Sequence, residues 1–84
     1  MRPRLVEIAT GKEFPVPGKI FLSSKRGTVE VDISEMGNSY ILSLVEGKVY
    51  WKKELVRGDK IYPLIENDQL RAYGKIYQFK VKEK

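Results

Sequence analysis

The chain has 84 residues, of which 42% are hydrophobic and 32% charged, a composition typical of one globular domain rather than a disordered segment. It contains no cysteine and no histidine, which excludes disulfides, thiolate and imidazole metal sites, cysteine nucleophiles and Ser-His-Asp triads. Sixteen Lys and Arg against eleven Asp and Glu give a net charge of +5, which would assist binding to phosphate, nucleic acid or anionic lipid.

Apolar and polar residues alternate with a period of two along most of the chain, which predicts strands rather than helices. In the first half, strands are predicted at 5–8, 13–16, 19–22 and 28–33, with turns at 9–12 and 23–27 and a loop at 34–38. Pro15 and Pro17 cannot donate hydrogen bonds to a ladder, so the second strand is predicted to lie or end at a sheet edge.

In the second half, strands at 39–45 and 48–51 are predicted to form a hairpin around a tight turn at Glu46-Gly47. Further short strands are predicted around Leu55-Val56, 60–62, 69–73 and 75–81. About eight to ten short strands predict a single all-β domain over 1–84, a small β-sandwich or a closed barrel. Its core is predicted to contain Leu5, Ile8, Phe14, Ile20, Leu22, Val29, Val31, Ile41, Leu44, Val49, Leu64, Leu70, Ile76 and Phe79.

The segment 23–27 offers two hydroxyls, two cations and a glycine, which is the chemistry of a phosphate-binding loop and also that of a solvated hairpin turn. Loops at one end of a sandwich converge and tend to carry the binding residues. We therefore predict one composite ligand-binding site made of Ser23, Ser24, Lys25, Arg26, Asn38, Ser39, Lys52 and Lys53. No pair of carboxylates has a spacing that favours acid–base catalysis, so no catalytic residue, metal site or cofactor is predicted, and the domain is expected not to be an enzyme.

One Trp, five Tyr and three Phe interleave with Lys and Arg, as in barrels that stack bases and bind oligonucleotides. The same rings are also favoured in any packed sheet. The basic residues are spread from Arg2 to Lys84 with Glu and Asp between them, so only weak, salt-sensitive nucleic-acid binding is expected. Tight binding that depends on Tyr50, Trp51 or Tyr77 would instead indicate a small basic β-barrel that binds nucleic acid.

A pattern near the C-terminus, Leu64-x-x-Asn67-Asp68-x-Leu70 followed by Tyr73-Gly74 and Phe79-x-Val81, resembles the closing strands of forkhead-associated (FHA) domains. Residues 5–8, 10–16 and 20–22 resemble the opening strands of that family, and residues 40–51 resemble its central hairpin. The resemblance implies a small β-sandwich of FHA-like type that binds another protein without catalysis.

The residues with which FHA domains read phosphothreonine are absent at the matching places. That family uses a Gly-Arg after the third strand, a Ser-x-x-His motif and an Asn-Gly in a later loop. Here the third strand reads Ile20-Phe21-Leu22-Ser23, and no histidine occurs. The resemblance therefore implies a protein-interaction or scaffolding module that does not depend on phosphothreonine.

A second motif, Asp32-x-Ser34-x-x-Gly37, is similar to the D-x-S-x-x-G motif of PilZ domains, which bind cyclic di-GMP. The R-x-x-x-R motif of that family is not matched, since Arg2 and Arg4 are two residues apart. This alternative implies that Arg4 lies close to the segment 32–37, so that both clamp one nucleotide.

The amino-acid composition also indicates the kind of organism and the cellular compartment that are expected for this protein. Lys and Glu dominate the charged residues, and with the absence of Cys and His this is typical of a thermophile. A cysteine-free chain favours a reducing interior, so cytoplasmic localisation is expected. No apolar run is long enough for a transmembrane helix or a signal peptide.

Overall fold

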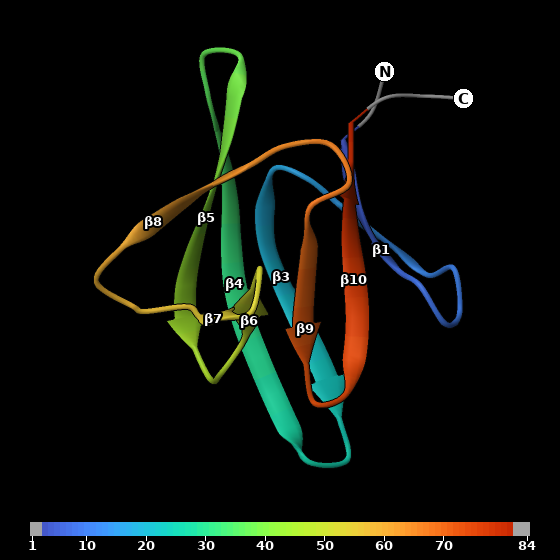
Figure 1. The fold of residues 1–84 in the computed structure, drawn as a ribbon. Helices are drawn as coiled ribbons and strands as arrows, with labels where there is room; N and C mark the ends of the chain where they lie inside the picture. The colour runs from blue at the N-terminus through green and yellow to red at the C-terminus, as the bar shows by residue number, and fades with distance from the viewer. Residues whose placement is uncertain (1–2, 82–84) are drawn as a thin grey trace.

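Two antiparallel sheets packed face to face make up the fold (Figure 1). The computed structural model describes residues 3–81, which form ten strands and contain no helix, and so no helix long and apolar enough to cross a membrane. The predicted all-β sandwich is confirmed.

The six-stranded sheet has the order β2-β1-β10-β9-β6-β7 and the four-stranded sheet the order β3-β4-β5-β8. The first sheet contains β1 (Arg4–Glu7), β2 (Glu13–Pro15), β6 (Tyr50–Trp51), β7 (Glu54–Leu55), β9 (Gln69–Ala72) and β10 (Lys75–Lys80). The second contains β3 (Gly18–Ser24), β4 (Gly27–Met36), β5 (Ser39–Glu46) and β8 (Ile61–Leu64). The first and last strands are neighbours, with Leu5 opposite Phe79. The prediction that the proline-bearing second strand lies at an edge is confirmed.

The core lies between the two sheets and is filled by alternate residues of each strand. Burying each large apolar side chain there stabilises the fold by about 1.5–3 kcal/mol. Of the predicted core residues, Leu5, Ile20, Leu22, Val29, Val31, Val49, Leu64, Leu70 and Phe79 are buried, and Phe14 and Leu44 pack against them partly buried.

Three predicted core residues, Ile8, Ile41 and Ile76, do not belong to the core. Ile41 precedes buried Leu42 and Ile76 precedes buried Tyr77, so both project from the outer faces of their sheets. Ile8 lies just beyond β1 and is 50% exposed. Where two apolar residues are adjacent in a strand, alternation alone does not say which of them faces inward.

The predicted hairpin around Glu46-Gly47 is wrong. β5 pairs with β4 and β8, whereas β6 pairs with β7 and β9, so the chain crosses here from the four-stranded sheet to the six-stranded one. A turn signal between two strands looks the same whether the strands pair with each other or belong to different sheets.

The predicted loop at 34–38 is also wrong. β4 continues to Met36 and reverses at Gly37 and Asn38, so that Met36 pairs with Ser39. Residues 34–38 have the composition of a loop, because most of them are polar and none is buried. The backbone of residues 34–36 nevertheless pairs with β5, and this pairing overrides the composition.

Candidate functional site

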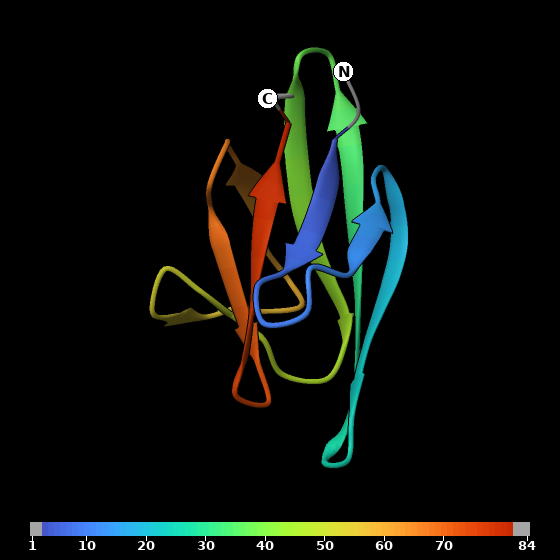
Figure 2. The same cartoon turned by 90° about the vertical axis from the view of Figure 1, so that its right-hand side faces the viewer.

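The eight predicted binding residues fall at three separate places. Ser23 to Arg26 form the end of β3 and its turn into β4, whereas Asn38 and Ser39 lie at the turn from β4 to β5. These turns stand at opposite ends of β4, as Figure 1 shows, and about 30 Å of strand separates them. Lys52 and Lys53 form the turn of the β6–β7 hairpin, at one edge of the six-stranded sheet (Figure 2). The predicted composite site is therefore wrong, because one uninterrupted strand holds two of its parts apart.

Three chain reversals do meet at one end of the sandwich. The Lys75 Nζ donates to the Ser23 carbonyl at 3.5 Å, and a Cβ on Gly27 would lie 2.9 Å from the Tyr73 hydroxyl. A Cβ on Gly47 would lie 3.0 Å from the Thr28 carbonyl oxygen. We call this region, formed by the β3–β4 turn, the β5–β6 connection and the β9–β10 turn, the turn end.

The β3–β4 turn is held by its own side chains. The Ser24 hydroxyl accepts a 3.0 Å hydrogen bond from the Arg26 backbone N–H and lies 3.5 Å from the Gly27 carbonyl, to which it donates. The Ser23 and Thr28 hydroxyls are 3.5 Å apart. The Ser24 hydroxyl therefore stabilises the turn, as Ser commonly does in such positions. The charged side chains that the turn exposes to solvent are those of Lys25 and Arg26.

The turn end is cationic. Lys25, Arg26 and Lys48 are exposed, and Lys75 is half-buried against Ser23. Within residues 3–81 none of these four cations forms an ion pair with a carboxylate. Their charge therefore stays available to an anionic partner.

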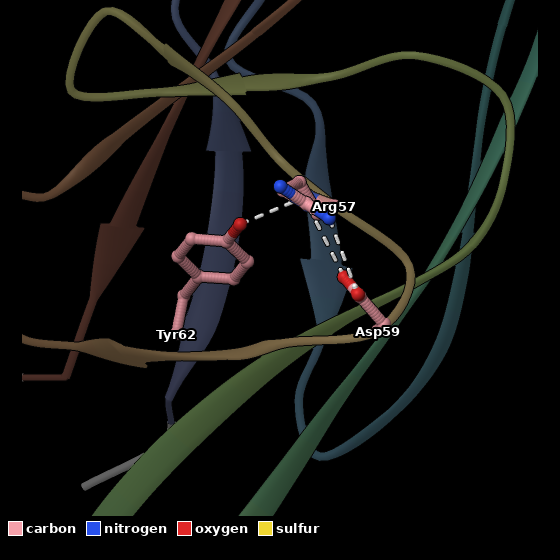
Figure 3. A network of polar contacts seen from close by, with 3 residues as sticks. All are labelled: Arg57, Asp59 and Tyr62. Atoms are coloured by element: carbon pink, nitrogen blue, oxygen red, sulfur yellow. Dashed lines mark hydrogen bonds and ion pairs between the residues drawn. The ribbon is translucent and has the colours of Figure 1, made fainter.

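The Arg57 guanidinium, by contrast, is already paired with a carboxylate (Figure 3). Its guanidinium lies 3.3 Å from each carboxylate oxygen of Asp59, and its backbone N–H donates to the Tyr62 hydroxyl at 2.9 Å. The Tyr62 ring in turn packs on Trp51, with ring centroids 5.3 Å apart. These contacts fix the connection from the β6–β7 hairpin to β8.

The residues of the D-x-S-x-x-G pattern lie along β4 and its turn. Asp32 and Ser34 alternate with buried Val31 and Ile33, so they project from the outer face of the four-stranded sheet. Arg4 alternates with buried Leu5 on the outer face of the other sheet, where its Nε lies 3.7 Å from a Glu13 carboxylate oxygen. The two halves of the clamp that the PilZ resemblance implies therefore lie on opposite faces, and Arg2 lies outside the described residues.

Of the three rings considered for base stacking, Tyr77 is 2% exposed and belongs to the core. Trp51 is half-buried against Tyr62, and its buried indole N–H has no hydrogen-bond partner. Tyr50 is 45% exposed. One ring of the three is thus open to a base.

Two tyrosines have shifted pKa values. Burial raises the pKa of Tyr77, and the nearby Glu7 carboxylate raises it further. Burial also raises the pKa of Tyr40, as do the charge of Glu35 and a hydrogen bond to it. Both shifts favour the neutral phenol, and neither group belongs to the turn end.

No family model matches this chain, and no curated protein matches it significantly. Its function is therefore inferred from the chemistry of the turn end and from the fold that positions it.

Proposed function

We propose that this domain is a non-catalytic protein-interaction module of FHA-like type, which binds an acidic segment of a partner protein at the turn end. The proposal is supported by four cations, Lys25, Arg26, Lys48 and Lys75, which come from three adjoining reversals of the sandwich. Within residues 3–81 none of them forms an ion pair with a carboxylate.

The FHA-like assignment is supported by two features. The chain is a sandwich of two antiparallel sheets, the class of fold that the sequence resemblance implies. The turn after β3 also lies beside the β5–β6 connection, since Gly47 approaches Thr28. In FHA domains the ligand is bound by residues after the third strand and in a later loop. An FHA-like site therefore needs the turn after β3 to lie beside a later connection.

The side chains of the β3–β4 turn favour recognition of negative charge in general rather than of phosphothreonine in particular. The β3–β4 turn supplies Lys25 and Arg26, but the Ser24 hydroxyl is engaged within the turn. Exposed cations bind carboxylates and phosphates alike, and salt screens them over about 8–10 Å. Binding is therefore expected to follow the charge of the segment and to weaken as salt concentration rises.

The test is a fluorescence-anisotropy titration with a short labelled peptide of Asp, Glu and Ser, at low and physiological salt. A Lys25→Glu/Arg26→Glu double variant is expected to weaken binding at least about tenfold. The matched control is Lys12→Glu/Lys60→Glu, which changes the net charge equally at two exposed lysines outside the turn end.

Two further arms separate the alternatives. A peptide carrying one phosphothreonine is expected to bind no more tightly than a peptide given the same charge by Asp. A strong preference for phosphothreonine, equal losses in both double variants, or binding of cyclic di-GMP that is lost on Ser34→Ala would contradict the proposal.

A further inference from the structure

A cavity of about 620 Å³ lies on the outer face of the six-stranded sheet, between the β6–β7 hairpin and β9. Its walls include Tyr50, Lys52 and Lys53 from the hairpin and Gln69 and Arg71 from β9. Figure 2 shows this hairpin projecting beside β9, at the edge of the sheet. The volume lies in the range of about 300–1,000 Å³ that holds small organic ligands. We call this cavity the cationic groove.

Three cations surround the cationic groove, and one of them is held in place. The Lys52 Nζ lies 3.7 Å from an Asp68 carboxylate oxygen and 4.7 Å from the centroid of the Trp51 ring. Asp68 is 8% exposed, and its second oxygen accepts a 3.0 Å hydrogen bond from the Ile65 backbone N–H. Within residues 3–81, Lys53 and Arg71 have no carboxylate partner. The groove therefore keeps an excess of positive charge.

The backbone that carries the two lysines is strained. Lys52 has φ 51° and Lys53 φ 68°, so both adopt the left-handed conformation that two-residue hairpin turns require. Asn-Gly or Asp-Gly is favoured at such turns, because other side chains crowd the following carbonyl. Strain of this kind is concentrated at ligand sites, and here the strained residues are the groove's two lysines.

Three neighbouring residues that line the groove suit a flat ring. Tyr50 is 45% exposed and stands opposite Arg71 in the register of β6 and β9, and Arg71 stands opposite Ile76 of β10. An aromatic ring, a guanidinium and an aliphatic side chain thus form one row across three strands. The exposed Gln69 amide adds a donor and an acceptor at the rim. The Asn67 amide adds its NH₂ donors, since its oxygen already accepts a 2.6 Å hydrogen bond from the Lys80 Nζ.

We propose that the cationic groove binds a nucleotide. Its phosphates would pair with Lys53, with Arg71 and with those N–H groups of the Lys52 ammonium that do not face Asp68. Phosphates commonly pair with guanidinium and ammonium groups in this way. Its base would stack on Tyr50, a contact that tolerates any base. This site is distinct from the turn end: the groove lines the outer face of one sheet, and the turn end lies at the reversals of β3, β5 and β9.

Calorimetric titration of the whole chain with ATP, adenosine and inorganic tripolyphosphate tests whether both parts of the ligand are read. ATP is expected to bind at least about tenfold more tightly than either adenosine or tripolyphosphate. Equal affinity for ATP and tripolyphosphate would show that the groove reads charge alone and would overturn the proposal. Absence of ATP binding would overturn it as well.

Single substitutions then locate the site. Arg71→Gln is expected to weaken ATP binding at least about tenfold, and Tyr50→Leu to weaken ATP binding by a similar factor while leaving tripolyphosphate binding unchanged. Both side chains are exposed, and thermal unfolding of each variant checks that the fold is retained. Unchanged ATP affinity in both variants would overturn the assignment to this groove.

Lys25→Ala, which alters the turn end, is expected to leave ATP affinity unchanged. Displacement of ATP by the acidic peptide would show that the groove takes a protein segment, and it would contradict the nucleotide proposal. Loss of acidic-peptide binding in the turn-end variants, with ATP binding intact, would leave both proposals standing, so the two can fail separately.

Discussion

Gly47 lies directly against Val29: a Cβ on Gly47 would stand 3.0 Å from the Val29 Cγ2 and 3.1 Å from its Cα. Such distances are tighter than nine in ten real Cβ contacts, so a Cβ here would require Val29 to shift by a few tenths of an ångström. The φ of Gly47 is +94°, which also favours glycine. This contact lies where the chain leaves the four-stranded sheet for the six-stranded one, and it brings the β5–β6 connection against the start of β4 at the turn end.

Gly47→Ala is therefore expected to destabilise the fold by about 2–4 kcal/mol, from backbone strain and overpacking together. The control is Gly74→Ala. Gly74 also has a positive φ of 77°, but a Cβ there would meet no atom within 4 Å, so only the strain of about 1–2 kcal/mol applies. Urea unfolding of both variants measures the difference, and equal losses would show that the approach to Val29 has no energetic consequence.

Leu42 and Ile41 are neighbours on β5 with opposite orientations, and they test the core directly. Leu42 is fully buried, so Leu42→Ala is expected to cost about 2–5 kcal/mol of unfolding free energy. Ile41 faces outward, so Ile41→Thr is expected to change stability by no more than about 0.5 kcal/mol. A larger loss at Ile41 than at Leu42 would mean that β5 is turned the other way.

Tyr77 makes stability sensitive to alkaline pH. Its pKa is raised in the fold by burial and by Glu7, so the folded state holds the phenol proton more tightly than the unfolded state. This contribution is complete below pH 10.0, the ordinary pKa of tyrosine, and is lost as pH rises through the higher pKa of the folded state. Tyr77→Phe is expected to make the fall in unfolding free energy above about pH 10 shallower than in the wild type.

The control for this effect is Tyr50→Phe, since the Tyr50 ring is 45% exposed. Glu7→Gln is expected to lower the pKa of Tyr77 by removing the carboxylate that raises it, which ultraviolet titration of tyrosinate would detect. Identical alkaline slopes in Tyr77→Phe, Tyr50→Phe and the wild type would exclude this role for Tyr77.

The strain at Lys53 is expected to oppose stability. Lys53→Gly and Lys53→Ala remove the same charge, but only glycine adopts φ 68° without a steric penalty. The glycine variant is expected to be more stable than the alanine variant by about 1 kcal/mol in thermal or urea unfolding. Both variants are expected to bind ATP more weakly than the wild type, because each lacks the Lys53 charge. The more stable glycine variant is therefore still expected to be a poorer binder than the wild type. Equal stability of the two would exclude strain at this turn.

The all-β sandwich class and most of the strands could be predicted from the sequence, because the period of two and the turn residues depend on local geometry. Alternation predicts Val29, Val31 and Phe79 in the core, and the missing N–H of Pro15 predicts that its strand lies at an edge, as observed. It could not choose between Ile41 and Leu42, nor show that Glu46-Gly47 joins different sheets, because both depend on contacts distant in sequence.

The candidate sites were harder to predict. Lys25, Arg26 and the Lys52–Lys53 turn were recognisable as cations in turns. Their separation from Asn38 follows from β4 continuing through 34–36, which loop-like composition concealed. Lys75 and Arg71 gave no local signal, since their places at the turn end and in the cationic groove arise only when β9 and β10 pair and pack.

Mapping amide chemical shifts during titration with the Asp, Glu and Ser peptide shows where on the domain an acidic protein segment binds. Binding at the turn end is expected to give the largest changes at Lys25, Arg26, Lys48 and Lys75, decreasing as salt is added. No change is expected at Gly37 and Asn38, at the far end of β4. Changes centred on Gly37 and Asn38, or spread evenly over the surface lysines, would contradict binding at the turn end.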